Sequence, residues 1–377
     1  MNIIERFKNQ RVSQLIHFKN RLKGSKPSQV ENCFRLKTQR SSFVTLKKKE
    51  GAKRAHYSGL QTCSSVWACP VCSSIISERR KKHLQEAINL WREKDPCNSV
   101  LMITFTTPHL IFQSLNDVLR IQDKAIRIMK KQPQRGRYKV WRSIMTDINS
   151  VGSFTGREIT WGQNGWHPHR HECTLAVRVP SADLKQCRED ILTAFSIAFQ
   201  KAGGVISDMR SFRRRAVQVD QITDDDGFER VSSYITKVEG QKWTLAQEAT
   251  KGNEKLAKNG NITPFGMLEA IRQGSDKSSL YQLKFYEYAL TMKGKKQFFP
   301  THGLNQFLKL NWKTDQEIMQ ESKSGEQYFF FSHEDWAQVL HFNIKGEIIV
   351  FTEGKNEFEF MRDLPHLLKD YQLKCAV

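Results

Sequence analysis

Three histidines alternate within five residues, at His167, His169 and His171. In a β-strand, alternate side chains project to the same face, so these imidazoles would converge. Neutral imidazole is a common metal ligand. A surface hairpin with incidental histidines explains one such residue better than three at a period of two, so we predict a metal site. His167 lies nearest the preceding turn and is the weakest candidate ligand.

A carboxylate is expected beside these imidazoles. Residues 163–165, Gln-Asn-Gly, form a turn signal between two strand-like runs. If Asn164 and Gly165 are a two-residue turn, Glu158 falls opposite His171, and Thr160 falls opposite His169. Two histidines and one glutamate leave coordination positions open around a hard divalent ion, for which we predict Mg²⁺ or Mn²⁺.

A tyrosine and a lysine three residues apart form a second candidate site. Tyr234 and Lys237, in the run RVSSYITKVEG, share one face of a predicted helix. A tyrosine hydroxyl can attack a phosphodiester and retain the bond energy as a phosphotyrosine, while a lysine orients the phosphate or favours the phenolate. Taken alone, the spacing is common on helices, and a half-buried aromatic residue beside a solvated amine explains it better.

A cysteine cluster has the spacing C-x5-C-x2-C, at Cys63, Cys69 and Cys72. We predict structural zinc, because the CPVC turn directs backbone amides toward a metal-bound thiolate. The candidates for the fourth ligand are Cys33, His56 and His83. Redox chemistry through Cys69 and Cys72 is the alternative, and it is less favoured because no thioredoxin-like strand precedes them. The other cysteines are interpreted as core or surface thiols: Cys97, Cys173, Cys187 and Cys375.

The charge of the chain indicates a polyanionic partner. Its 377 residues carry a formal net charge of +21, far more than solubility requires. Residues 1–60 hold fifteen Lys and Arg against three Asp and Glu, whereas residues 311–377 hold seven against twelve. No run is long and apolar enough to span a bilayer, and no apolar stretch follows the first charges. We therefore expect a cytoplasmic protein that binds nucleic acid and no membrane.

The predicted elements follow the order strand, helix, hairpin, helix, strand, helix, which indicates an α+β fold with a central antiparallel sheet flanked by helices. We expect four regions along the chain. They are a basic, zinc-binding region at 1–95, a domain with the histidines and Tyr234 at 96–245, a helical extension at 246–310 and a small acidic lobe at 311–377. In the acidic lobe, the runs EQYFFFS and EIIVFTE are both predicted as strands.

Over roughly residues 33–275, the chain resembles the replication initiators of small rolling-circle plasmids, within the HUH endonuclease superfamily. The matching segments, in family order, are Cys33, CSSVWACPVC, ITFTT, EITWGQNGWHPHRH, SYITK and NITPFGMLEAI. HPHRH and CPVC are the most specific of these. The resemblance implies that residues 96–245 form an HUH-type endonuclease domain.

The resemblance also implies roles for particular residues. His169, His171 and Glu158 would bind the catalytic ion, and Tyr234 would nick the origin strand. Cys33 becomes the favoured fourth ligand of the zinc site.

The implied substrate is single-stranded or hairpin origin DNA, because the tyrosine must reach an unpaired backbone. Cleavage would leave a 5′-phosphotyrosyl enzyme and a free 3′-OH that primes polymerase. Trp161 and Trp166 are expected to stack on bases. Host helicase and polymerase are candidate partners.

Two positions depart from the family pattern. The residue between the two ligand histidines is usually apolar, and here it is Arg170, which leaves open how the sheet packs behind the hairpin. In some relatives a glutamate one helical turn before the tyrosine activates water to end the cycle, and here that position is Arg230, with Glu229 one residue away. The same helix has no second nucleophilic tyrosine. These motifs therefore do not specify the termination step.

Two other functions fit the same motifs. An HUH transposase would use these residues to transfer strands between the ends of an element, and would need those ends in place of a plasmid origin. A non-enzymatic, zinc-dependent nucleic-acid-binding regulator would need the cysteines and the charge, but not Tyr234.

Overall fold

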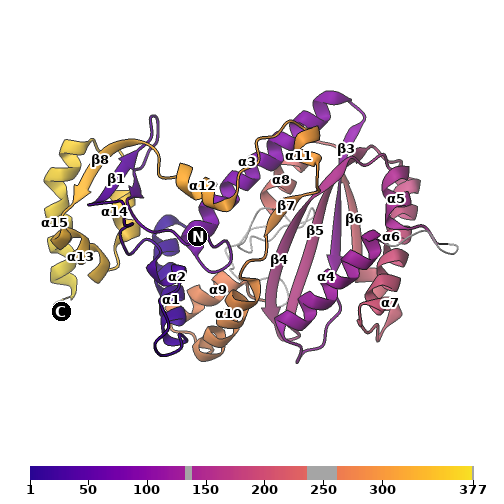
Figure 1. Ribbon diagram of the computed structural model, residues 1–377, viewed down its shortest axis with the longest axis horizontal. Helices are drawn as coiled ribbons and strands as arrows, with labels where there is room; N and C mark the ends of the chain where they lie inside the picture. The colour runs from indigo at the N-terminus through magenta and orange to yellow at the C-terminus, as the bar shows by residue number, and fades with distance from the viewer. Residues whose placement is uncertain (132–137, 236–260, 376–377) are drawn as a thin grey trace, which may run out of the picture. The chain divides into compact units, whose positions relative to one another are not determined.

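The structure, a computed structural model, describes residues 1–131, 138–235 and 261–375. It divides into two compact units (Figure 1). One unit combines Met1–Ile76, Met267–Ala289 and Lys313–Val377, and the other combines Ser77–Gly266 and Leu290–Trp312. Both contain helices and antiparallel strands, in agreement with the expected mixed fold. The domain boundaries expected from the sequence remain a prediction, because this division reflects packing and not activity.

The unit that contains the histidines is built on an antiparallel sheet with the strand order β6-β3-β5-β4-β7. Its strands are β3 (Asn98–Thr106), β4 (Gly152–Gly162), β5 (Gly165–Val177), β6 (Val217–Ile222) and β7 (Phe298–Pro300). β3 lies inside the sheet with helices over both faces. This explains why its sequence is a nearly continuous apolar run rather than an alternating one.

The two faces of this sheet carry different cores. On one face, Ile103 and Phe105 of β3 pack with Phe195. On the other, Met102 of β3 packs with Leu84 and Phe228. The helices of this unit are α4 (Leu115–Lys131), α5 (Trp141–Asp147), α6 (Ser181–Lys201), α7 (Met209–Arg215), α8 (Asp225–Ile235), α11 (Leu304–Phe307) and most of α3 (Pro70–Lys94).

β4 and β5 form the predicted hairpin, but the predicted register is wrong by two residues. Gly162 pairs with Gly165, so the turn consists of Gln163 and Asn164. Glu158 therefore lies opposite His169 and not opposite His171. A slip of two residues keeps every side chain on its predicted face, because strand side chains alternate with a period of two. The carboxylate and the imidazoles consequently still share a face.

The other unit contains a second antiparallel sheet, with the order β2-β1-β8. Its strands are β1 (Val44–Lys48), β2 (His56–Ser58) and β8 (Glu326–Phe331). Its helices are α1 (Ile3–Lys19), α2 (Gln29–Asn32), α9 (Pro264–Arg272), α10 (Ser278–Met292), α12 (Asp315–Glu321), α13 (His333–His341), α14 (Lys345–Phe351) and α15 (Glu357–Cys375). Of these, α9 and α10 continue into the other unit. β8 pairs with β1, so the acidic C-terminal segment completes a sheet begun by the basic N-terminal segment.

The prediction of a strand at EIIVFTE is wrong, because this segment forms the helix α14. Tertiary packing explains the difference. A side chain at Gly346 would lie 2.6 Å from the Cα atom of Ile4 in α1, so the two helices are in close backbone contact. Ile348 and Ile349 are buried as well. Burial of these β-branched residues therefore outweighs their local preference for strand. Within the described ranges, no helix has the length and apolar character needed to cross a membrane.

Candidate active site and metal centre

His169 and His171 project from one face of β5, and two threonines of β3 lie beside them. Thr106 Oγ1 is 3.1 Å from His169 Nδ1, and Thr104 Oγ1 is 3.0 Å from His171 Nδ1. The contacts follow from register, since each threonine is the direct cross-strand partner of its histidine. With Nδ1 held by a hydroxyl, each ring is oriented to present Nε2, as metal-binding imidazoles commonly are. The matching alternation of Thr-Phe-Thr and His-Arg-His is the sequence signal for this arrangement.

Glu158 reaches the imidazoles diagonally across the hairpin. Its Oε2 atom lies 3.3 Å from His171 Nε2, and the ring centroids of His169 and His171 are 6.2 Å apart. The three side chains share one face but are not gathered as tightly as the cysteines described below. Among the described residues, only those cysteines bring three or more Cys, His, Asp or Glu ligand atoms within 4.8 Å of one another. The structure thus brings His171 and Glu158 into contact, with His169 adjacent.

Two imidazoles on this strand, His169 and His167, are held in the neutral form. Burial lowers the pKa of His169 to about 4; Glu158 opposes this shift, while His171 and His109 add to it. Burial, together with His109 and His169, lowers the pKa of His167 to about 4. At neutral pH these rings therefore carry a lone pair, as a metal ligand must.

His167 has a partner that sequence reasoning missed. His109, in the loop after β3, lies with Nε2 2.9 Å from His167 Nδ1, and the two rings are in edge contact at 4.5 Å between centroids. This pairing ties the loop to the start of β5. The signal in the sequence was the position of His109, three residues after the strand that supplies Thr106.

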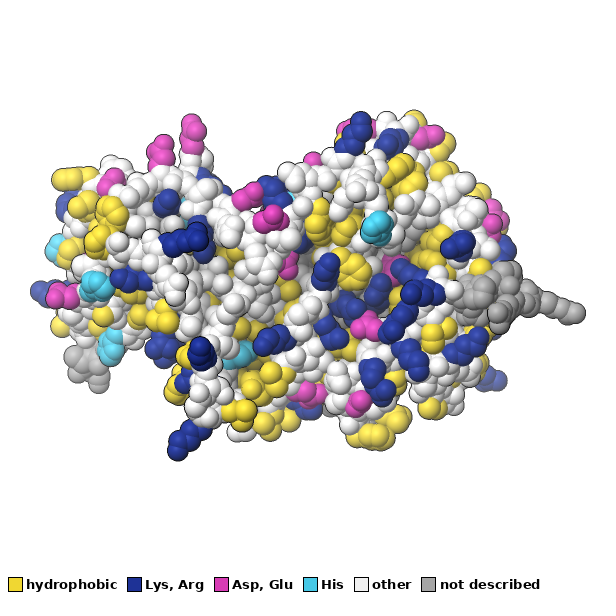
Figure 2. Space-filling view, in the orientation of Figure 1, with side chains coloured by type: hydrophobic (Ala, Val, Ile, Leu, Met, Phe, Trp, Pro, Cys, Tyr) yellow, Lys and Arg dark blue, Asp and Glu magenta, His cyan; other side chains and the backbone are white. Residues whose placement is uncertain are grey.

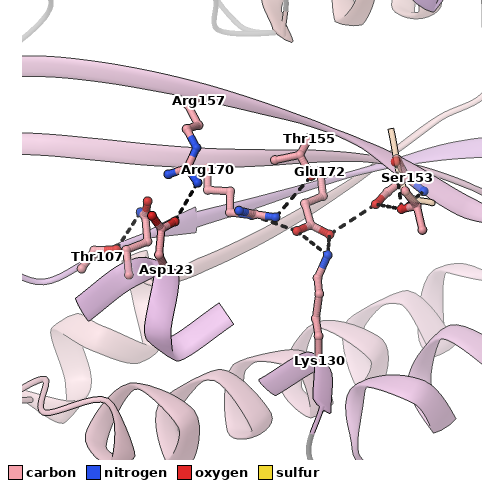
Figure 3. A network of polar contacts seen from close by, with 10 residues as sticks. Thr107, Asp123, Lys130, Ser153, Thr155, Arg157, Arg170 and Glu172 are labelled. Atoms are coloured by element: carbon pink, nitrogen blue, oxygen red, sulfur yellow. Dashed lines mark hydrogen bonds and ion pairs between the residues drawn. The ribbon is translucent and has the colours of Figure 1, made fainter. Parts of the chain in front are cut away.

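Arg170 lies on the opposite face of β5 from the histidines, in a buried polar network (Figure 3). Its Nε donates to Glu172 Oε1 at 3.0 Å, and its Nη2 donates to Thr155 Oγ1 at 3.3 Å. Lys130 of α4 donates to the same carboxylate, with Nζ 2.8 Å from Oε2. The arginine that departs from the family pattern is thus neutralised by Glu172, two residues along the same strand. This network explains how the sheet packs behind the hairpin.

Replacement Glu172→Gln is expected to lower the free energy of unfolding by about 3–5 kcal/mol at pH 7, because it leaves the buried Arg170 and the partly exposed Lys130 without their carboxylate. Burial raises the pKa of Glu172, but Lys130 and Arg170 outweigh it and leave the pKa below its ordinary value. The carboxylate therefore stabilises the fold above its unfolded-state pKa of about 4.3, and this contribution is lost as pH falls through the lower folded-state value.

Urea unfolding at pH 7 and at successively lower pH measures this effect. The difference between wild type and Glu172→Gln should narrow as the solution becomes acidic. Asp147→Asn, which removes an exposed ion pair with Lys139 in the same unit, serves as the control and should unfold like wild type. A Glu172→Gln variant as stable as wild type at pH 7 would contradict the assignment.

Tyr234 lies in the last turn of α8, a helix that packs against β4 and β5 of the histidine hairpin. Phe228 and Val231 of the same helix are buried in the core of this face. The side chain of Tyr234 and the whole of Lys237 lie outside the described residues. Their predicted roles remain predictions.

The structure brings Cys33, Cys63, Cys69 and Cys72 together, and the group contains neither His56 nor His83. The Sγ atom of Cys33 lies 3.8 Å from that of Cys69 and 3.4 Å from that of Cys72. Four sulfurs bonded tetrahedrally to zinc at about 2.3 Å lie about 3.8 Å apart. These separations fit zinc and are too long for a disulfide, in which the sulfurs are about 2.05 Å apart.

A buried lysine from the C-terminal segment lies near these thiols. Gln10 Nε2 donates to Cys69 Sγ at 3.2 Å, and Lys345 Nζ lies 3.4 Å from Gln10 Oε1. Burial lowers the pKa of Lys345 to about 8, while the thiols of Cys33 and Cys69 oppose that shift. The lysine therefore lies where it would offset the negative charge of a tetrathiolate metal centre.

Comparison with known proteins gives two similarities. Over 304 residues, the chain is 22% identical to a protein named Protein rep from Streptomyces lividans, and the match covers 67% of this chain and 65% of that protein. Over 138 residues, it is 28% identical to a protein named Neomycin resistance protein from Streptomyces cyanogenus, and the match covers 31% of each. The chain thus spans less than two thirds of the length of either relative. No protein-family model and no solved structure matches the chain.

Proposed function

We propose that this chain is a rolling-circle plasmid replication initiator with an HUH-type endonuclease domain, which nicks and rejoins single-stranded origin DNA through a phosphotyrosine at Tyr234. The observation that carries the proposal is the pair of imidazoles, His169 and His171, each held at Nδ1 by a threonine and accompanied by the carboxylate of Glu158. The similarity to a Streptomyces protein named Protein rep supports the same role.

In the proposed mechanism, His169, His171 and Glu158 would hold Mg²⁺ or Mn²⁺, which would supply positive charge to stabilise the phosphate in the transition state. Thr104 and Thr106 keep the two rings oriented toward the site. The neutral state of His169, which follows from its burial, keeps its Nε2 lone pair available.

The phenolic oxygen of Tyr234 attacks the phosphorus in line, as the phenol loses its proton and the bond to the 3′ oxygen breaks. The departing oxygen takes up a proton and becomes a 3′-OH, and the 5′ phosphate stays on the tyrosine. Attack of a 3′-OH on this phosphotyrosine reverses the exchange and rejoins the strand. Lys237 is assigned to orient the phosphate or favour the phenolate.

Incubation of the full chain with Mn²⁺ and single-stranded oligonucleotides that tile the DNA carrying its gene tests the proposal. We expect a protein–DNA adduct that survives denaturing electrophoresis. His169→Ala should reduce its yield on the order of a hundredfold, through loss of charge stabilisation. His302→Ala, which changes an exposed histidine of the same unit, should retain it. If wild type forms no adduct with any oligonucleotide, the proposed activity is wrong.

The outer face of α4 carries a row of cations suited to DNA that extends beyond the cleavage site. Arg120, Lys124, Arg127 and Lys131 are exposed and follow the i, i+4, i+7, i+11 spacing of one helical stripe. Figure 2 shows Lys and Arg side chains gathered on this face of the molecule. Such a row matches a sugar-phosphate backbone, which binds through its charge rather than its sequence.

Replacing Lys124, Arg127 and Lys131 together with glutamine is expected to weaken DNA binding and flatten its dependence on salt. Each lost contact with a duplex phosphate lowers the slope of log affinity against log salt by about 0.9. Fluorescence anisotropy with a labelled duplex between about 50 and 200 mM salt measures this slope. Lys369→Gln, an exposed lysine of α15, is the control and should leave it unchanged. A triple variant whose affinity depends on salt as that of wild type does would show that this row of cations does not contact DNA.

A further inference from the structure

The loop between β3 and α4, residues 107–114, presents three consecutive apolar side chains to solvent. Leu110 is 48% exposed, Ile111 is 66% exposed and Phe112 is 80% exposed. Isolated exposed apolar residues are ordinary, but a run of three indicates a surface that contacts another molecule. We call residues 110–113 the apolar tip.

The apolar tip is a closed turn. The backbone N–H of Gln113 donates to the carbonyl oxygen of Leu110 at 3.1 Å, and the Gln113 side-chain oxygen accepts from the Leu110 N–H at 2.8 Å. Ile111 and Phe112 therefore occupy the two central positions of a β-turn. Their exposure is a consequence of this local hydrogen bonding, which holds both side chains at the end of the loop.

The loop is also anchored to the histidine hairpin. His109 Nε2 lies 2.9 Å from Nδ1 of His167, and His167 precedes the proposed ligand His169 by two residues. Gly165 has a positive φ of 89°, and a side chain there would lie 2.9 Å from the carbonyl oxygen of Ile111. The backbone of the apolar tip thus lies directly against the start of β5. Only glycine combines this backbone conformation with such a close approach.

The tryptophans that the sequence suggested for base stacking are not suited to that role. Trp161 and Trp166 pair with each other across the hairpin and alternate with the histidines, so they lie on the opposite face of the sheet. Trp166 is also only 1% exposed. The expectation that Trp166 stacks on bases is therefore wrong. Phe112 offers an exposed aromatic ring on a loop that contacts the histidine strand.

The cations that follow the apolar tip in the chain favour a nucleic acid as its partner. The loop leads directly into α4, which packs on the sheet face away from the histidines and whose row of cations begins at Arg120. A nucleic acid matches both features, because its phosphates pair with cations while its bases stack on an aromatic ring. The proposed activity also requires that the strand at the cleavage site be unpaired, because the tyrosine must reach its backbone.

Resting on the proposed function, we propose that Ile111 and Phe112 form a wedge that stacks against the bases beside the scissile phosphate and keeps the strand unpaired. Apolar side chains at the end of a fixed loop are used in this way by proteins that unstack DNA. The loop would thus hold the DNA strand unpaired, a role that is separate from the chemistry of the histidines and Tyr234.

The test uses the full chain and short DNA oligonucleotides carrying 2-aminopurine at successive positions, either single-stranded or within a hairpin stem. We expect Phe112→Ala to weaken single-strand binding about tenfold, as loss of one stacked base would, and to abolish the fluorescence change at the stacked positions. Phe112→Trp should retain both properties. Phe358→Ala, at a residue 73% exposed in α15, is the matched control and should behave as wild type.

The proposal is overturned if Phe112→Ala binds and unstacks DNA as Phe358→Ala does. It is equally overturned if Phe112→Ala alters the sedimentation coefficient but not the DNA affinity, since the apolar tip would then join copies of the chain. Neither readout requires cleavage. A chain that unstacks bases without forming an adduct would refute the proposed activity alone, and an adduct that is indifferent to Phe112 would refute the wedge alone.

Discussion

Replacement Tyr234→Phe is expected to abolish the covalent protein–DNA adduct, with a loss on the order of a thousandfold or more, while DNA affinity stays within about twofold. The substitution removes only the hydroxyl oxygen that would attack the phosphorus. Tyr234 lies in the last turn of α8, which packs against the two strands that bear His169 and Glu158. Denaturing electrophoresis of the Mn²⁺ reaction measures the adduct, and fluorescence anisotropy measures the affinity.

Tyr286→Phe is the matched control for this variant. Tyr286 is half-buried in α10, where its hydroxyl donates to the carbonyl oxygen of Asn20 at 3.3 Å, so its loss should leave the adduct intact. An adduct that persists in Tyr234→Phe would show that another residue is the nucleophile. Replication that proceeds normally with Tyr234→Phe would favour a DNA-binding regulator that performs no chemistry.

We expect the four-cysteine centre to hold structural zinc, and removal of this zinc to unfold the unit that contains it. Structural zinc sites contribute about 10–16 kcal/mol of apparent binding free energy, which exceeds the total stability of many domains. Cys33, Cys69 and Cys72 are fully buried. Chelation should therefore eliminate the cooperative thermal transition of this unit, and Cys69→Ser should reproduce the loss. Circular dichroism and hydrogen exchange in peptides from α1 and α14 measure the effect.

Lys345→Met is expected to weaken zinc binding about 10- to 100-fold, the usual effect of removing a group that supports metal ligands.

Cys97→Ser, which changes an exposed thiol, is the control for Cys69→Ser and should retain one zinc ion per chain and melt as wild type does. Lys369→Met, which changes an exposed lysine, is the control for Lys345→Met and should bind zinc as wild type does. Purified protein without zinc, or a Cys69→Ser variant that melts normally, would contradict a structural metal at this centre.

The face occupied by each candidate ligand followed from the sequence, whereas the register did not. The alternation of His167, His169 and His171 places all three on one side of a strand, whichever residues form the turn. The sequence predicted a turn at Asn164 and Gly165, whereas the turn in the structure consists of Gln163 and Asn164. Glu158 therefore lies opposite His169 and not opposite His171. Because strand geometry repeats every two residues, this slip left the predicted residues on one face.

Contacts between segments far apart in the chain were beyond the reach of local patterns. The sequence left open how the sheet packs around Arg170, and in the structure Lys130 and Glu172 place this arginine in a buried polar network. EIIVFTE favours a strand by its residue types, but its close contact with α1 makes it a helix. Lys130 of α4 and Ile4 of α1 are the partners that local patterns could not supply, whereas Glu172 lies on the same strand as Arg170.

The alternating histidines show most clearly what the sequence determines and what the tertiary structure decides. The sequence by itself determined the antiparallel hairpin, the face its ligands share and the cysteine spacing, because these depend on the period of a strand and on short turns. Only the tertiary structure decided that Thr104 and Thr106 hold the rings, that Cys33 joins the other thiols, and that His109 fixes an exposed apolar tip beside the hairpin. These contacts depend on strand pairing and packing between distant segments, and the spacing within any one segment does not fix which segments meet.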